Sequence, residues 1–256
     1  MLDLRNVWKS FDGQDVLRGI DLAVTQGEFV SFIGHSGCGK STLLNVVGGL
    51  LDADSGEVSL DGKEITGPGP DRAMVFQNYS LLPRLSLLAN VREAARAARP
   101  QRKAAQNDEV VERYLRAVGL WDHKDKRPAQ VSGGMQQRTA VARAFAVGPR
   151  LLLLDEPFGA LDALTRARLQ QQLIELWQHE SETETVLMVT HGIDEAILLA
   201  DRIVVMANPP SPSILDVIPV DLPRPRDRTG VIGQPAFRVV QERLMALLTA
   251  EEPAAA

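Results

Sequence analysis

The chain contains 256 residues, of which 45% are apolar and 24% are charged, and its formal net charge is −5. These values fit one large α/β domain, with or without an inserted subdomain, and give no electrostatic reason to expect nucleic acid binding. No stretch of the sequence approaches the ~18 apolar residues that span a bilayer. The first nine residues lack the charged-then-apolar order of a signal peptide, so we expect a cytoplasmic protein.

The N-terminal part has the pattern of antiparallel strands. Residues 1–27 alternate apolar and polar positions around a turn at residues 11–14, which predicts a hairpin. A second hairpin is expected over residues 57–65, where Asp61 and Gly62 supply the turn.

Residues 34–41 read Gly-His-Ser-Gly-Cys-Gly-Lys-Ser and fill every fixed position of the phosphate-binding pattern G-x-x-x-x-G-K-[ST]. The bare pattern occurs by chance in about one chain in a hundred of this length. Here it lies between an apolar run at residues 28–33, which predicts a buried strand, and a helical pattern at residues 40–47. Because strand, loop and helix come in this order, the sequence predicts a nucleotide site.

The chemistry of this loop assigns a role to each part. Backbone N–H groups hold the phosphates, the Lys40 ammonium spreads charge over the β and γ groups, and the Ser41 hydroxyl is offered to Mg²⁺. Cys38 is either a reactive thiolate favoured by the helix N-terminus or an inert small residue. The residues expected to bind nucleotide here are Gly34, His35, Ser36, Gly37, Cys38, Gly39, Lys40, Ser41 and Thr42.

The middle of the chain changes in character after an expected strand at residues 73–76. Residues 79–130 are rich in Arg, Ala and Gln with helical periodicity, which predicts an inserted helical subdomain. A further helix opens near Ser132, a plausible N-cap, and stops at Gly148. Gly133 and Gly134 would cost a helix about 1 kcal/mol each, so we expect something, such as a phosphate, to approach their backbone closely.

The run Leu-Leu-Leu-Leu-Asp-Glu at residues 151–156 predicts a central parallel strand that ends in two carboxylates. Asp155 is the expected partner of Mg²⁺, and Glu156 is the expected base that polarises the attacking water. The alternative is a helix-capping pair before Pro157.

A later strand at residues 185–190 ends at His191, and another strand is expected at residues 202–206. A lone histidine is more often structural, but a position at a strand's carboxyl end favours a catalytic role. Beyond Arg228, the spacing of apolar residues predicts a short amphipathic helix that packs on the domain, and residues 251–256 are expected to fray. The apolar residues of that helix are Phe237, Val240, Leu244, Leu247 and Leu248.

Together these motifs resemble the ATP-binding cassette (ABC) ATPases in order and spacing, over about residues 1–225. Within that superfamily, the chain is similar to import ATPases for nitrate, cyanate and bicarbonate, followed by taurine and sulfonate importers. The motifs that carry the resemblance are the phosphate loop, Gln77, the signature at residues 131–135, residues 151–156, residues 159–162, and Thr190 with His191. Supporting segments lie at residues 75–83, 191–196, 199–202 and 221–228.

The resemblance implies an α/β fold, a P-loop nucleotide hydrolase core with an antiparallel β subdomain and an inserted α-helical subdomain at about 79–130. The ATP-binding domain would cover 1–228, and 229–256 would form the C-terminal helix and tail. ATP and Mg²⁺ are the implied cofactors. Phe11 would stack on adenine, Gln77 would contact Mg²⁺ or the attacking water, and His191 would contact the γ-phosphate.

The same resemblance implies partners. Ser132, Gly133 and Gly134 would bind the ATP of a second cassette subunit, identical or homologous, and Asp162 would lie at that junction. Residues 79–90 would contact transmembrane permease subunits, so the chain would sit at the cytoplasmic face of the cell membrane. An extracytoplasmic solute-binding protein would complete the system.

Four positions depart from the family pattern, and two rival functions remain. Val131 and Met135 change the signature mildly, whereas Arg84 and Gly192 fall near the presumed permease contact and dimer interface. One rival is a cassette ATPase of DNA repair or translation. The other is a small-molecule kinase, which should lack the Ser132–Gly134 segment and act as a monomer.

Overall fold

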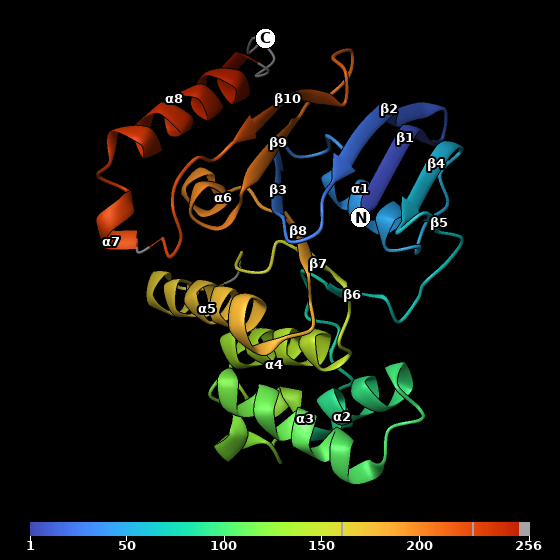
Figure 1. Ribbon diagram of the computed structural model, residues 1–256, viewed down its shortest axis with the longest axis vertical. Helices are drawn as coiled ribbons and strands as arrows, with labels where there is room; N and C mark the ends of the chain where they lie inside the picture. Colours follow the sequence, from blue (N-terminus) through green and yellow to red (C-terminus); the bar gives the residue numbers. More distant parts are fainter. Residues whose placement is uncertain (160, 227, 251–256) are drawn as a thin grey trace. The chain divides into compact units, whose positions relative to one another are not determined.

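The computed structural model describes residues 1–159, 161–226 and 228–250, and its chain divides into two compact units (Figure 1). The first unit comprises Met1–Pro68 and Thr185–Ala256, and the second comprises Gly69–Glu184. Ala160 of the segment 159–162, and residues 251–256, which were expected to fray, lie outside the described residues. Within the described residues, no helix is both long enough and apolar enough to cross a membrane.

The first unit contains an antiparallel sheet built from the two predicted hairpins. Asp12 and Gly13 have φ values of 50° and 79°, and Asp61 and Gly62 have φ values of 52° and 73°. Such left-handed pairs form tight turns that match the twist of the strands they join. Both hairpin predictions are therefore confirmed. The strand order is β2 (Gln14–Val24), β1 (Leu2–Phe11), β4 (Ser55–Leu60) and β5 (Lys63–Glu64).

The first unit also contains a parallel set of strands. Every residue of β3 and β8 is buried, which explains why both strands read as continuous apolar runs. β3 pairs in parallel with both β8 and β9, and β10 runs antiparallel to β9. The strands are β10 (Ile214–Pro219), β9 (Arg202–Met206), β3 (Phe29–Gly34) and β8 (Thr185–Val189).

Helices of the first unit follow the ends of these strands. α1 (Lys40–Val47) follows β3 after the glycine-rich loop, and α6 (Ile193–Leu199) follows β8 after His191. α7 (Arg228–Val231) and α8 (Pro235–Ala250) come after β10. Because parallel strands end at the same edge of a sheet, the carboxyl ends of β3 and β8 place the loop and His191 on one edge.

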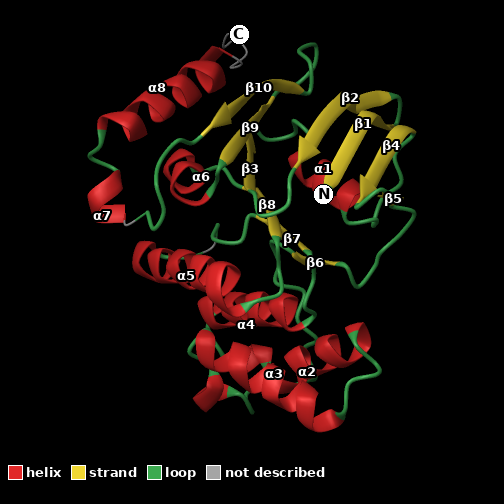
Figure 2. Cartoon of the chain, in the orientation of Figure 1, coloured by secondary structure: helices red, strands yellow, loops and turns green. Residues whose placement is uncertain are grey.

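The second unit is mainly helical (Figure 2). β6 (Arg72–Val75) pairs in parallel with β7 (Leu151–Asp155). α2 and α3 both pack against α4, and the rings of Tyr114 and Phe145 stack at a centroid distance of 6.0 Å. That the stretch 79–130 forms a separate subdomain stays a prediction. The α-helices are α2 (Leu87–Ala98), α3 (Ala104–Ala117), α4 (Gly133–Ala146) and α5 (Ala163–Glu175). Shorter turns lie at η1 (Trp121–His123), η2 (Pro128–Gln130) and the π-helical η3 (Leu176–Glu180).

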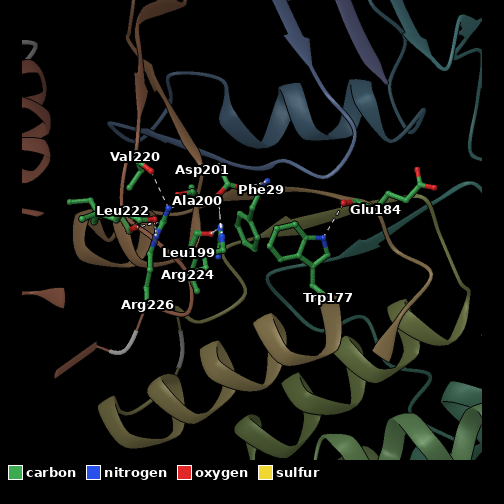
Figure 3. A network of polar contacts seen from close by, with 11 residues as sticks. Phe29, Trp177, Glu184, Leu199, Ala200, Asp201, Val220, Leu222, Arg224 and Arg226 are labelled. Atoms are coloured by element: carbon green, nitrogen blue, oxygen red, sulfur yellow. Dashed lines mark hydrogen bonds and ion pairs between the residues drawn. The ribbon is translucent and has the colours of Figure 1, made fainter. Parts of the chain in front are cut away.

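Half-buried polar contacts join the segment after β10 to the rest of the first unit (Figure 3). The Asp201 carboxylate accepts hydrogen bonds from the Phe29 backbone N–H at 2.9 Å and from Arg224 Nη2 at 2.8 Å. The Arg226 guanidinium donates to four backbone carbonyls, and burial followed by the charge of Arg224 lowers its pKa to about 10. These acceptors are Ile197, Ala200, Val220 and Leu222. In the second unit, the Trp177 indole N–H donates to the Glu184 carbonyl at 3.1 Å.

Candidate functional site

The glycine-rich loop of the first unit has the backbone of a phosphate cradle. Gly37 and Gly39 have φ values of 86° and 99°, which side-chain-bearing residues rarely adopt. A Cβ at Gly34 would lie 2.3 Å from the Met206 carbonyl oxygen, and one at Gly39 would lie 2.9 Å from Leu17 Cδ2. The loop is therefore packed tightly against its own unit, and only glycine fits these positions.

Lys40 begins α1 and turns its side chain back over the loop. Its Nζ donates to the carbonyl oxygens of Gly34 at 2.7 Å and His35 at 2.8 Å. The first N–H groups of α1 have no partner within the helix, and the helix dipole favours an anion there. Because Ser36, Gly37 and Ser41 are exposed, a ligand can reach the loop, and the residues present fit a nucleotide phosphate.

Cys38 lies inside this loop but is shielded from solvent. Its side chain is 1% exposed, and its Sγ lies 3.6 Å from Lys40 Nζ. Thiol reagents act on accessible thiolates. The structure thus favours the inert alternative for this residue.

His191 and Phe11, the other predicted site residues of the first unit, are both exposed. His191 follows β8 in a turn where the Thr190 hydroxyl donates to the Glu195 carboxylate and accepts from the Gly192 N–H at 3.0 Å. An exposed ring differs from the buried histidine of a purely structural role. Phe11 ends β1 with 44% of its surface exposed, and Lys9 Nζ lies over its ring at 5.6 Å from the centroid. The exposed part of the ring is open to a stacking partner.

Helix α8 packs on the first unit, as its amphipathic pattern predicts. Phe237 and Leu244 are fully buried, and Gln241 Nε2 donates to Asp194 Oδ1 of α6 at 2.8 Å. His35 Nε2 lies 2.7 Å from the Leu248 carbonyl oxygen. Since a carbonyl only accepts, the imidazole nitrogen is the donor. A residue of the phosphate loop thus has its side chain fixed by the C-terminal helix, a contact that sequence spacing does not reveal.

Two predicted catalytic side chains meet in the second unit. Glu156 comes directly after β7 with a left-handed backbone, φ 47°. Gln77 Nε2 donates to Glu156 Oε2 at 3.0 Å. Asp155 is the last residue of β7, so the two carboxylates follow one another at the carboxyl end of the strand.

The signature segment begins α4, and its predicted cap is confirmed: Ser132 Oγ accepts from the Met135 N–H at 3.3 Å. The two glycines that follow face crowded surroundings. A Cβ at Gly133 would lie 3.3 Å from the Tyr79 hydroxyl, and one at Gly134 would lie 3.1 Å from Thr165 Cγ2. Packing within the second unit therefore gives a second reason for glycine here, besides a close phosphate.

Asp162 caps α5 at the predicted subunit junction. Its Oδ1 accepts from the backbone N–H groups of Leu164 at 3.1 Å and Thr165 at 3.0 Å. Hydrogen bonds from the Thr165 side chain and backbone hold the pKa of this carboxyl below its ordinary value.

A cavity of about 270 Å³ opens beside the Gln77–Glu156 pair. Gln137 of α4 lines it, is 1% exposed, and has no hydrogen-bond partner for either amide atom among the described residues. Polar side chains form part of its lining, and a cavity of this size is large enough to hold water. Sequence reasoning missed Gln137, because a glutamine on a helix carries no signal of its own. The lining residues are Gln77, Tyr79, Gln137, Glu156, Pro157, Gly159 and Leu161.

The comparisons with known proteins agree on one kind of protein. The family profile described as "ABC transporter" matches residues 17–159. The nitrate import ATP-binding protein NrtD of Synechococcus elongatus is 51% identical over 221 residues, which cover 86% of this chain and 80% of that protein. The bicarbonate transport ATP-binding protein CmpC of the same organism is 48% identical over 254 residues. That match covers 97% of this chain but only 38% of CmpC.

A solved structure extends the likeness to three dimensions. The dimeric post-hydrolysis state of the ATP-binding cassette MJ0796, bound to ADP and Pi, matches with a TM-score of 0.75 and 31% sequence identity. The match covers 86% of this chain and 99% of that one.

Proposed function

The chain belongs to the ABC transporter family, and from that premise we propose that it is the ATP-hydrolysing subunit of an importer for a small anion, with nitrate as the first candidate. The 51% identity to a nitrate import ATP-binding protein carries the proposal. The predicted α/β cassette fold and the ATP hydrolase class are confirmed by the same comparisons and by the cassette structure bound to ADP and Pi. Bicarbonate, nitrite and cyanate are close alternatives, and taurine or an alkanesulfonate is the alternative solute class.

ATP would bind to the phosphate loop of the first unit. The backbone N–H groups at the start of α1 and the Lys40 ammonium would hold its phosphates, and Phe11 would stack on its adenine. Mg²⁺, when bound with ATP, neutralises charge on the phosphates. Its expected protein ligands are Ser41, Gln77 and Asp155.

Hydrolysis would depend on the carboxylate that follows β7. Glu156 would accept the proton of the attacking water. The Gln77 amide, which is hydrogen bonded to Glu156 at 3.0 Å, would orient the Glu156 carboxylate. His191 would contact the γ-phosphate, and the link from Thr190 to Glu195 would fix the turn that carries the imidazole.

The subunit would act in pairs at the cytoplasmic face of the membrane. Ser132, Gly133 and Gly134 would bind the nucleotide of a second cassette, and the dimeric state of MJ0796 supports this arrangement. Residues 79–90 would pass the resulting movement to permease subunits that receive the solute from an extracytoplasmic binding protein. ATP would favour the closed pair because it supplies contacts only there.

Growth and uptake in cells that lack the chain would test the proposal. Such cells would receive nitrate as sole nitrogen source or, in parallel, taurine as sole sulfur source, and be complemented with wild type or Lys40→Ala. We expect a nitrate uptake defect that only wild type repairs. A taurine defect with normal nitrate use would move the assignment to sulfonates. Normal growth in both media would overturn nitrate as the solute and reopen the choice among the other anions.

A further inference from the structure

Arg143 of helix α4 forms two hydrogen bonds to the loop that follows Gln77. Arg143 Nη1 donates to the Ser80 carbonyl at 2.6 Å, and its Nη2 donates to the Tyr79 carbonyl at 3.0 Å. The planar guanidinium thus binds two successive carbonyls in a forked geometry that lysine cannot reproduce.

The two residues bound by Arg143 have an unfavourable backbone conformation. Tyr79 and Ser80 are consecutive non-glycine residues with φ values of 63° and 47°. A left-handed residue of this kind costs about 1–3 kcal/mol and persists only where its surroundings enforce it. Contacts within the loop are short: the Ser80 N–H donates to the Asn78 carbonyl at 2.7 Å, and Ser80 Oγ donates to Asn78 Oδ1 at 2.6 Å. Arg143 connects residues 79 and 80 to helix α4, while Asn90 of α2 binds the backbone of Leu82 further along the loop.

Two functional groups depend on the shape of this loop. Gln77, three residues before Ser80, is held against Glu156. The Tyr79 hydroxyl lies over the signature glycine, 3.3 Å from where a Cβ of Gly133 would stand. If the loop relaxed to ordinary backbone angles, both placements would change together.

We propose that Arg143 is a positioning residue for ATP hydrolysis, which holds residues 79–80 in their left-handed conformation and thereby sets Gln77 against Glu156 and Tyr79 against Gly133. The inference rests on the proposed function, because it assigns Gln77 and Glu156 to hydrolysis. Arg143 acts through the loop and contacts neither of these two side chains in the described hydrogen bonds.

The charge of Arg143 strengthens both contacts. Its guanidinium is half-buried, and that desolvation lowers the pKa of Arg143. Arginine nevertheless stays charged in proteins. Hydrogen bonds from a charged donor are stronger than those between neutral groups, so the exposed bond to Ser80 and the half-buried bond to Tyr79 both contribute to holding the loop.

The test uses the full chain in four forms: wild type, Arg143→Met, Ser80→Gly and the double variant. Arg143→Met should lower kcat for ATP hydrolysis about tenfold, with KM for ATP within about twofold, because the loss falls on the reacting geometry. Ser80→Gly alone supplies the reference kcat with which the double variant is compared. In the double variant, glycine accepts the left-handed angles without strain, so a substantial part of the lost kcat should return.

This rescue separates positioning from packing. If Arg143 only filled space in α4, a glycine at residue 80 would restore nothing, and a double variant no more active than Arg143→Met would overturn the inference. An unchanged kcat in Arg143→Met would also overturn it. Should Arg143→Met fail to fold, Arg143→Lys keeps the charge and tests the fork. Faster amide exchange at residues 77–82 in that variant is expected, and unchanged exchange would count against the proposal.

The failure of this inference is distinct from a failure of the proposed function. The four variants are compared by ATP hydrolysis alone, whereas the solute is tested by growth. A chain that hydrolyses ATP with the expected variant pattern but supports no anion uptake would leave Arg143 assigned and remove the importer.

Discussion

The phosphate loop of the first unit and the Gln77 region of the second unit both need left-handed backbone, but they obtain it differently. In the phosphate loop, Gly37 and Gly39 adopt these angles at no steric cost. In the second unit, Tyr79, Ser80 and Glu156 adopt them with side chains present. The first region is thus shaped by local sequence, and the second is held by tertiary contacts such as the fork of Arg143.

The largest expected effect comes from substitution of Glu156, one of the left-handed residues of the second unit. Glu156→Gln removes the proposed base, and kcat for ATP hydrolysis should fall by about 10²–10⁴-fold while ATP still binds. The variant should form an ATP-dependent dimer, measured by size-exclusion chromatography with light scattering, and wild type without ATP serves as the control. A variant that stayed monomeric with ATP would count against the paired cassette mechanism.

A smaller but still severe effect, on ATP affinity, is expected from substitution of a glycine in the phosphate loop. Gly39→Ala places a Cβ 2.9 Å from Leu17 Cδ2 at a residue with φ 99°, so the loop must distort. ATP affinity, measured by equilibrium titration, should fall by about tenfold or more. Gly13→Ala is the matched control, because it shares a positive φ of 79° but has no atom within 4 Å of the added Cβ. Equal losses in both variants would show that strain alone, without the crowding, explains the result.

A modest effect is expected on the free energy of unfolding when the strained residue Ser80 is replaced. Ser80→Gly relieves a left-handed residue, and this gain of about 1–2 kcal/mol offsets the entropy cost of glycine and the loss of the hydrogen bond from Ser80 Oγ to Asn78. The free energy of unfolding should therefore change by less than about 0.5 kcal/mol. Ser59→Gly, in strand β4 with ordinary angles, should cost about 1 kcal/mol. Urea denaturation of the two variants measures the difference. Equal destabilisation would mean that Ser80 is not strained.

The smallest expected effect concerns acid. The pKa of Asp162 is lowered from 3.8 by hydrogen bonds, mainly from Thr165, so its contribution is present above that value and is lost as pH falls through the lower folded pKa. Asp162→Asn keeps an amide oxygen as the cap. The amide does not titrate, so the melting temperature of the Asp162→Asn variant should change less than that of wild type between about pH 5 and pH 3. Identical acid profiles would contradict this assignment of the shift.

The features that the sequence predicts are those that depend on local residues, whereas contacts between distant elements were not predicted. The strand, loop and helix around Lys40, the two Asp-Gly hairpins and the Ser132 cap were all predictable, because each depends on neighbours within a few residues. Three features were not predictable: the contacts of Arg143, the Gln137 amide, which has no partner in the described part of the chain, and the link between Thr190 and Glu195. The first two of these depend on where α4 packs, which residue spacing along one chain does not determine.

The contact between His35 and helix α8 makes the end of that helix a natural position for an optical reporter. Thr249 is exposed and adjoins Leu248, whose carbonyl accepts the His35 hydrogen bond. The sequence contains one cysteine, Cys38, and it is buried. A dye attached to Thr249→Cys would therefore label one site selectively and would sense whether the phosphate loop is loaded, without a substitution in the loop itself.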